Sequence, residues 1–313
     1  MFEIDNGILS EVGSLRTERE ENKSVSEYDI IIIGHITRDT LEYRGKVTPF
    51  TGGAAYFSSF AARRSNAKIC VVTKLARRDF GILDALKKEG IEVIAFPSSK
   101  TTSIENVFES DDPDKRKVRL IAQADPFQPE DIPKADAKIY YLAGLFVGEI
   151  PATLIEYLAK KGKVALDLQA MLRSNEGGFY AFKDWPEKER YLPMVDFLKA
   201  DSQESEVIAG TSDREKAARM LRQWGGKEVM ITHASEVIIC QGEKIHRAPF
   251  NPRNLSGRTG RGDTCFGSYT AWRLRHGIEE SVRFAAALTS IKMERFGPFS
   301  GTVDDVLARI KTL

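Results

Sequence analysis

The sequence has few cysteines and histidines and no long apolar run. Its 313 residues include three cysteines and four histidines. The cysteines are odd in number and widely scattered, so they match neither a disulfide framework nor a zinc motif, which favours a reducing cytoplasmic setting. The longest apolar run, DIIIIG, has the length of a strand and falls far short of the roughly 18 residues of a membrane span. A disulfide scaffold, a zinc module and a membrane protein are therefore not expected.

An excess of charge of either sign is also lacking. Lys and Arg number 46 against 45 Asp and Glu, which leaves a formal net charge of +1. This balance gives no electrostatic reason to expect nucleic acid or a membrane surface as a partner. Residues 1–26 carry several acids and lack the basic start and apolar stretch of a signal peptide. We interpret them as a polar extension, followed by one domain over residues 27–313.

Short apolar runs alternate with amphipathic segments from Tyr28 onward. Runs rich in β-branched residues predict buried strands, and these runs are YDIIIIG, AKICVVTKLA, IYYLAG, KVALDLQ, VDFLKAD and EVMIT. Helical spacing is found in FGILDALKKEG, PATLIEYLAKKG and SDREKAARMLRQWGG, with Ser212 expected to cap the last of these. This order predicts an α/β fold with a parallel sheet, helices on both faces and ligands at the carboxyl ends of the strands.

One region interrupts the alternation. TTSIENVFESDDPDKRKVRLIAQAD holds two strand-like runs around a polar turn with a proline, which indicates a β-hairpin. Together with residues 41–50 it would form a small second sheet, with lid strands from about 41–50 and 100–124. Such a sheet beside the strand ends could act as a lid; ordinary surface strands are the alternative.

The segment GRTGRGDTCFG, residues 257–267, leads into a helical pattern. Gly260 and Gly262 would then lie at a helix N-terminus, where free amides and the helix dipole attract an anion. Asp263 would compete with that anion. It makes sense there if it accepts a proton from a hydroxyl while the amides hold a phosphoryl group. The alternative is a plain aspartate cap beside a tight glycine turn.

The stretch TGRGDTCFGSY resembles the C-terminal signature of the ribokinase-like (PfkB) carbohydrate kinases. Two other segments resemble motifs of that family in the same order: GHITRDT followed by TGGAAYFSSFAA, and LKADSQESE. The resemblance covers about residues 28–313. It implies a ribokinase-like three-layer sandwich with a mostly parallel central sheet flanked by helices, plus a small β-sheet lid. The implied activity is ATP-dependent transfer of the γ-phosphoryl group to a hydroxyl of a small sugar or polyol.

The resemblance also implies roles for single residues. Asp263 would be the general base, and the backbone of Gly260, Arg261 and Gly262 would be the anion hole. Asp39 would hold sugar hydroxyls, with a turn residue at a strand end as the alternative. Gly52 and Gly53 would line the sugar pocket, against the alternative of a simple tight turn.

Metal and nucleotide candidates follow from the same resemblance. Asp201 and Glu204 match the motif that organises water and Mg²⁺ near the phosphates, and an outer-sphere role suits them because Mg²⁺ keeps several waters. A helix-capping acid pair is the alternative. Thr232, Ser290 and Gly297 are candidates for contacts with the nucleotide, and packing roles are open for them.

The sequence departs from the family pattern at several positions. Residues 257–259 replace an Asp-Thr-Thr segment whose acid helps bind a monovalent cation in many relatives, so activation by potassium is in question. Arg261 replaces a small residue of the anion hole; its side chain could fork onto a phosphate or a carboxylate, or point to solvent. Phe57 stands in place of a sugar-binding asparagine, and His233 in place of a glycine of the nucleotide loop.

The loss of that asparagine argues against a standard ribokinase or fructokinase. LDLQAMLR, ADPFQPEDIP and LFVGEIP resemble the inositol-kinase-like branch instead. There Gln169 could bind a polyol hydroxyl and Arg173 a phosphate or carboxylate, unless both are helix-entry residues on the surface.

Two other functions stay open. A nucleoside kinase of the same superfamily could stack a base on Tyr56 and Phe57. A catalytically weak regulatory or ligand-binding protein on the kinase scaffold is the other. The expected partners are a small-molecule substrate and a nucleotide, and the resemblance adds a homodimer formed through the lid.

Overall fold

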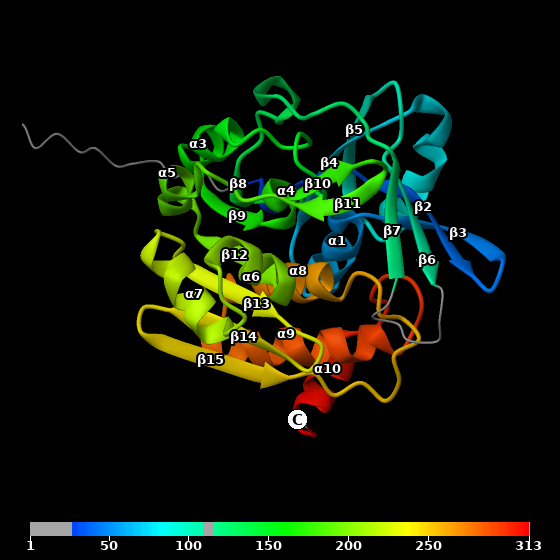
Figure 1. The fold of residues 1–313 in the computed structure, drawn as a ribbon. Coiled ribbons are helices and arrows are strands. Elements are labelled where there is room, and N and C mark those ends of the chain that lie inside the picture. The colour runs from blue at the N-terminus through cyan, green and yellow to red at the C-terminus, as the bar shows by residue number, and fades with distance from the viewer. Residues whose placement is uncertain (1–26, 109–115, 313) are drawn as a thin grey trace, which may run out of the picture.

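The β-branched runs of the sequence form one large sheet in a computed structural model that describes residues 27–108 and 116–312 (Figure 1). The predicted extension, residues 1–26, lies outside the described residues. The strands of this sheet are β1 (Tyr28–Ile33), β4 (Ile69–Leu75), β5 (Glu92–Pro97), β8 (Ala137–Leu142), β9 (Lys163–Asp167), β12 (Phe197–Asp201), β13 (Glu228–Thr232), β14 (Glu236–Gln241) and β15 (Lys244–Pro249). Their order is β15-β14-β13-β12-β9-β8-β1-β4-β5. Neighbours from β13 to β5 pair in parallel, whereas β14 and β15 are antiparallel additions at one edge.

A second sheet stands beside the first and has the order β10-β11-β7-β6-β2-β3. Its strands are β2 (Thr37–Tyr43), β3 (Lys46–Gly52), β6 (Ser103–Phe108), β7 (Arg116–Ala122), β10 (Arg173–Glu176) and β11 (Phe179–Phe182). The predicted lid segments are thus strands of a small sheet, although the first hairpin starts at residue 37 rather than 41. The hairpin β10–β11 was not predicted from the sequence.

Helices cover both faces of the large sheet. One layer is formed by α1 (Ala54–Arg64), α2 (Asp84–Lys88), α8 (Arg261–Arg273) and α9 (Ile278–Met293), with α10 (Val303–Ile310) packed against α9. The other contains α3 (Thr153–Ala159), α6 (Ser202–Ala209) and α7 (Arg214–Gln223). The short helices are α4 (Gln169–Leu172), α5 (Lys188–Tyr191) and the 3₁₀ turns η1 (Arg77–Leu83), η2 (Pro129–Asp131) and η3 (Leu192–Met194). The predicted three-layer α/β sandwich with a small second sheet is confirmed.

The core follows from the alternation of side chains along the central strand β1. Ile30 and Ile32 pack toward α1 and α8, and Ile31 and Ile33 pack toward α3 and α7. All four are fully buried, as expected for a strand covered on both faces.

Two helix starts differ from the sequence prediction. The cap of α7 is Asp213, not Ser212, because the Asp213 carboxylate accepts hydrogen bonds from the amides of the first turn. The last glycine-rich segment turns helical earlier than expected: α8 begins at Arg261 with Gly260 as its cap. Gly262 and Asp263 therefore lie inside the first turn.

None of the helices in residues 27–108 and 116–312 combines the length and apolar character that crossing a bilayer requires.

Candidate active site

The first turn of α8 is the centre of the candidate site. Gly260 caps this helix with φ 79° and ψ 18°, a left-handed conformation that favours glycine. A methyl group on Gly260 would lie 2.3 Å from Cγ of Phe57, so the ring of Phe57 also excludes any side chain there. The amide of Arg261 donates to the Arg258 carbonyl at 3.2 Å. Within the described chain, the amides of Gly262 and Asp263 have no such acceptor, and free helix N-terminal amides attract anions.

A buried lysine lies directly beneath these amides. A methyl group placed on Gly262 would lie 3.3 Å from Nζ of Lys199, a residue that is 2% exposed. The register of β12 and β9 pairs Lys199 with Asp167, and its ammonium donates to both carboxylate oxygens of Asp167 at 3.0 Å. Although burial disfavours the charged form, the carboxylates of Asp167, Glu204 and Asp263 raise the pKa of Lys199. The site therefore keeps a permanent positive charge.

The predicted metal pair lies at the start of α6. Asp201 and Glu204 form a capping box, with hydrogen bonds of 2.8 and 2.7 Å between each carboxylate and the other's amide. Glu204 is fully buried and accepts a 2.7 Å hydrogen bond from Arg173, whose guanidinium also lies 3.4 Å from Asp201. Burial opposes the charge of Arg173, but these two carboxylates raise its pKa.

This arrangement limits how Mg²⁺ could bind. Glu204 is fully buried and is engaged by Arg173, by the Asp201 amide and, at 3.7 Å, by the Lys199 ammonium, which disfavours direct coordination of Mg²⁺ by this carboxylate. The Asp201 side chain is 29% exposed and can reach an ion through water. No group of three or more potential metal-ligating side chains occurs among the described residues. The residues present thus fit a hydrated Mg²⁺ held from its outer shell.

Asp263 differs from the other carboxylates of the site because it has no hydrogen bond or ion pair with any described residue. It is half-buried and close enough to two ammonium groups to raise the pKa of both Lys199 and Lys292 against the effect of burial. Its lone pairs are therefore free to accept a proton from a bound hydroxyl.

The predicted sugar-binding residues gather between β2 and β3. Asp39 is 5% exposed, and its Oδ1 accepts a 3.0 Å hydrogen bond from the amide of Ile104 in β6. A methyl group on Gly52 would lie 2.4 Å from Oδ2 of Asp39 and 2.9 Å from Oγ1 of Thr37. Gly53 caps α1, and Phe57 in that helix packs on Gly260, the cap of α8. The two halves of the candidate site are thus in contact through α1.

Buried polar atoms without a partner are concentrated here. Of the eleven such side-chain atoms among the described residues, six lie at the strand ends or in the first turn of α8: Thr37 Oγ1, Gln169 Nε2, Arg173 Nε, Thr232 Oγ1, Arg261 Nε and Thr264 Oγ1. Because burying a polar group without a hydrogen bond is unfavourable, this concentration marks the region as a candidate binding site for a polar ligand.

The three nucleotide candidates differ in their surroundings. The hydroxyl of Thr232 has no partner and lies 3.6 Å from the position of a methyl group on Gly262. Ser290 is committed within the protein: it donates to the Ala286 carbonyl at 2.7 Å and accepts from the Asn251 amide at 2.8 Å. Gly297 lines a small pocket and has open space around its Cα.

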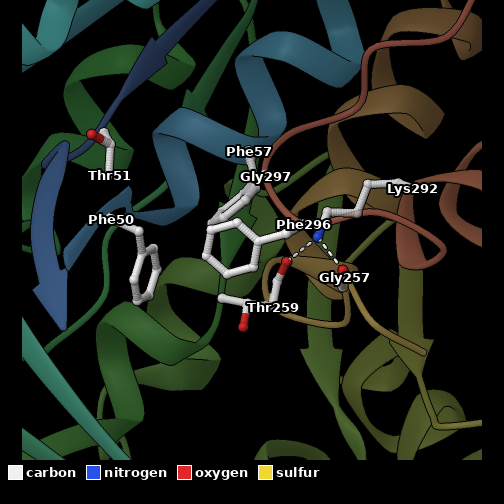
Figure 2. Close-up of a pocket in the computed structure, with 8 residues that line it drawn as sticks. All are labelled: Phe50, Thr51, Phe57, Gly257, Thr259, Lys292, Phe296 and Gly297. Atoms are coloured by element: carbon white, nitrogen blue, oxygen red, sulfur yellow. Dashed lines mark hydrogen bonds between the residues drawn. The ribbon is translucent and has the colours of Figure 1, made fainter. Parts of the chain in front are cut away.

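That pocket lies beside the segment that enters α8 and is shown in Figure 2. Its lining consists of Phe50, Thr51, Phe57, Gly257, Thr259, Lys292, Phe296 and Gly297. The Lys292 ammonium points to the carbonyl oxygens of Gly257 and Thr259. On the lid side, the rings of Phe50 and Phe296 meet edge to face with centroids 5.7 Å apart.

Sequence reasoning missed Asp167, Lys199 and Lys292. A signal existed for the first two, because a lysine within VDFLKAD and an acid at the end of KVALDLQ place charges in strands that are otherwise apolar. Buried charges are rarely unpaired, so the two strands could have been predicted to pair through them. For Lys292 the surrounding helix gave no comparable signal.

Comparison with protein families matches residues 23–304 to the pfkB family carbohydrate kinases. The chain belongs to the PfkB family. It is therefore an enzyme of the carbohydrate and polyol kinase class, in agreement with the family expected from the glycine-rich signature.

Among solved structures, this PfkB kinase resembles a pyrophosphate-dependent kinase of the ribokinase family bound to sulfate, with a TM-score of 0.84 and 36% identity over 89% of this chain and 99% of that one. A second structure, a kinase of the same kind with a pyrophosphate analogue and myo-inositol, gives a TM-score of 0.83 and 34% identity over 89% and 99% of the two chains. The ribokinase of Arabidopsis thaliana shares the fold, with a TM-score of 0.70 at 19% identity over 91% of this chain and 99% of that one.

Two curated relatives carry different substrate names. The cytidine kinase of Thermococcus kodakarensis is 26% identical over 88% of this chain and 99% of its own length. The inositol 3-kinase of Zea mays is 29% identical over 77% of this chain and 65% of its own, so this chain spans less than two thirds of the maize protein.

Proposed function

We propose that this kinase transfers a phosphoryl group from pyrophosphate to a hydroxyl of a cyclic polyol of the inositol type. The observation that carries the proposal is the concentration of six partnerless buried polar atoms around the first turn of α8 and the strand ends. Five of these atoms, all except Arg173 Nε, are proposed to meet the hydroxyls and anionic oxygens of bound ligands. A polyol and a phosphate donor supply the two kinds of group.

Asp263 is the proposed general base. It accepts the proton of the acceptor hydroxyl as that oxygen bonds to the phosphorus, and the bond between phosphorus and the leaving phosphate oxygen breaks with its electron pair on the leaving group. Asp263 forms no ion pair with any residue that the structure describes, which supports this role because a carboxylate held by a cation is a weaker proton acceptor.

The anion hole is proposed to consist of amides and two cationic side chains. The amides of Gly262 and Asp263 face the transferring group, and Lys199 adds its positive charge beneath them. The sequence suggested that Arg261 contributes its backbone amide to the anion hole. That amide is hydrogen-bonded to the Arg258 carbonyl, so we propose that Arg261 acts through its guanidinium instead. Prearranged charges of this kind stabilise the charge that develops during phosphoryl transfer.

The choice of donor rests on this positive charge. Burial and the nearby Arg258 lower the pKa of Arg261, and its Nε has no partner, as expected of a cation prepared for a multivalent anion. The likeness to pyrophosphate-dependent kinases at 34–36% identity supports the same donor. ATP, the donor implied by the family signature, is the alternative. Of the predicted nucleotide contacts, the Thr232 hydroxyl has no partner and could bind ATP. The Ser290 hydroxyl is already hydrogen-bonded within the protein and gives ATP no support.

Mg²⁺ would be held through its water by Asp201, where it would neutralise charge on the donor phosphates. Lys199 and Arg261 are proposed to neutralise the negative charge of the donor that Mg²⁺ leaves. Asp39, Thr37 and Gln169 are proposed to bind acceptor hydroxyls, with Gly52 and Gly53 leaving room for the ring. Arg173 is proposed to hold Glu204 and Asp201 in place rather than to bind substrate, because both carboxylates already engage it.

A donor-by-acceptor matrix tests the proposal. Purified protein with Mg²⁺ is given pyrophosphate or ATP, each with inositol isomers, hexoses, ketogluconates and nucleosides, and phosphorus NMR follows product and leaving group. We expect turnover with pyrophosphate and an inositol. Turnover with ATP but not with pyrophosphate would show that ATP is the donor. Turnover confined to nucleosides would show that the acceptor is a nucleoside and not a polyol.

A nucleoside acceptor is the second candidate because the Thermococcus cytidine kinase aligns along 99% of its length. The proposed stacking residues argue against it: Tyr56 and Phe57 are 6% and 3% exposed and belong to the core. A base would have to stack elsewhere.

Two further points belong to the proposal. A reducing, cytoplasmic location is compatible with the free, buried thiols of Cys70, Cys240 and Cys265. A homodimer formed through the small sheet is supported by exposed apolar side chains on its strands, among them Val47, Ile121 and Phe179.

A further inference from the structure

Lys292, near the end of α9, is a buried cation with backbone partners. Its side chain is 2% exposed, and its ammonium donates to the carbonyl oxygens of Gly257 and Thr259 (Figure 2). Among the described residues no carboxylate forms an ion pair with it. A buried charge without an anion is costly unless its hydrogen bonds are satisfied, so the two carbonyls are what holds the ammonium in this position.

The two carbonyls belong to the loop that enters the proposed phosphate-binding turn, residues 260–262 at the start of α8. Gly257 lies so close to the chain after α9 that a methyl group on it would be 1.6 Å from the carbonyl oxygen of Arg295. Its amide donates to the Met293 carbonyl at 2.8 Å. The loop is thus clamped against the end of α9, and the missing acid at position 257 has a physical cause, since no side chain fits there.

Phe57 connects this clamp with the helix cap. The Lys292 ammonium lies 4.9 Å from the centre of the Phe57 ring, a distance at which the ring face attracts a cation. The same ring packs on Gly260. Lys292, Phe57 and the loop carbonyls therefore form one unit directly behind the free amides of α8.

We propose that the Lys292 ammonium is a built-in monovalent cation that positions the phosphate-binding turn. It holds the carbonyls of residues 257 and 259 and so keeps the turn at Gly260–Gly262 in the geometry that receives the donor phosphate. Its effect on catalysis rests on the proposed function, and it acts through the backbone rather than on the reacting atoms. Carbonyl oxygens can also bind potassium, but here the ammonium takes that position, so the enzyme needs no added monovalent cation.

Two substitutions of Lys292 separate charge from volume. Lys292→Met keeps the length of the chain and removes the charge, and Lys292→Ala also opens a space that faces the two carbonyls. Lys74→Met is the control for removing a buried lysine elsewhere. Lys74 donates to the Pro126 carbonyl at 2.9 Å, but it also forms a 2.7 Å ion pair with Asp131 and contacts Phe127 on the other face of the sheet.

The first readout is activity in potassium, ammonium, sodium or choline chloride at constant ionic strength. We expect wild-type kcat to vary by less than about twofold among the salts. Both Lys292 variants should lose kcat by on the order of 10²-fold, the scale of losing one group that stabilises the transition state, while the KM of the acceptor changes little. Potassium or ammonium should restore Lys292→Ala at least about tenfold and leave Lys292→Met unchanged, because the methionine fills the space. Lys74→Met should keep the wild-type kcat.

The second readout needs no activity. A bound ion stabilises the folded state, so potassium should raise the Tm of Lys292→Ala and leave the Tm of wild type and Lys292→Met unchanged, relative to sodium. This result would support the built-in cation even if the donor-by-acceptor matrix showed no turnover. Absence of turnover would contradict the proposed function but not the inference about Lys292. Activation of wild type by potassium of more than about threefold would overturn the inference, and that measurement stands even if a variant does not fold. A kcat of Lys292→Met within twofold of wild type would overturn it as well.

Discussion

At the scale of single residues, the carboxylates of the site differ in what they contact. Asp167 is bound by Lys199, and Glu204 and Asp201 are bound by Arg173. Asp263 alone among these four has neither partner, although it lies at the start of α8 where an anion would bind. The three paired carboxylates hold the cations of the site, and the fourth is the one that we propose for proton transfer.

The substitution Asp263→Asn tests this division. We expect kcat to fall by about 10²–10⁴-fold, the usual contribution of a positioned base, because an amide cannot accept the hydroxyl proton. Binding of the acceptor, measured by calorimetry, should persist, and the Tm should stay close to wild type because the Asp263 side chain has no hydrogen bond with the described part of the chain that the change would break. Equal and negligible turnover of wild type and variant across the full matrix would favour a regulatory protein.

Lys292 is expected to make both stability and activity depend on pH. Burial lowers its pKa to about 7, against a partial rise caused by the Asp263 carboxylate of α8. A folded pKa below the unfolded value of 10.5 means that the unfolded chain binds more protons between these two values, so the contribution of Lys292 to stability increases as pH rises from about 7 to 10.5. The ammonium needed for positioning is lost over the same range, and activity should decline.

Opposite trends in stability and activity are therefore expected in wild type above pH 7. Urea unfolding and kcat, each measured from pH 6 to 10, check this. In Lys292→Met the stability increase assigned to this group should vanish, and the remaining activity should lose its alkaline decline. An unchanged alkaline decline in the variant would assign the titration to another group.

At the scale of elements, the strands of the large sheet could be predicted because their apolar runs are long and rich in β-branched residues. The hairpin β10–β11 could not, because each strand has four residues and the first, RSNE, is polar. Its Gly177–Gly178 turn was a usable signal. The pairing of Lys199 with Asp167 depends on two strands whose residues are 32 positions apart, a neighbourhood that only the sheet order supplies.

The cap of α8 is an element-scale feature that a matched pair of glycines can test. Gly260 and Gly242 both have positive φ, 79° and 57°, but a methyl group would strike Phe57 at Gly260 and meet nothing within 4 Å at Gly242. Gly242→Ala should cost about 1–2 kcal/mol from backbone strain alone. Gly260→Ala should cost more and abolish turnover, as measured by urea unfolding and the kinase assay. Equal losses at both positions would show that the Phe57 contact has no role.

At the scale of the whole molecule, strand register gives the small sheet a mixed outer face. Pairing places Phe179 opposite Arg119 and Val47 opposite Glu42, on the face away from Asp39. Phe179 and Val47 are 47% and 56% exposed. An apolar patch with charges around it is typical of a surface that meets another protein.

We expect this face to form the interface of a homodimer. Replacing Val47 and Phe179 together by Asp should convert a dimer into a monomer in light scattering after size exclusion, because the interface would then bury two unpaired charges. Leu307→Asp, at a residue of α10 that is 41% exposed, is the control and should stay dimeric. A wild type that is monomeric at micromolar concentration would contradict the prediction.

The small sheet is assembled from three hairpins that follow β1, β5 and β9 in the chain. Strands of the large sheet separate the three hairpins in the sequence, so we expect the hairpins to meet only after the large sheet has brought their ends together. Contacts between such distant segments form late because chain entropy is lost first. The small sheet should therefore be the last part of the protein to fold and the first to exchange its amide hydrogens, so that the cover over the acceptor site opens without unfolding the catalytic core.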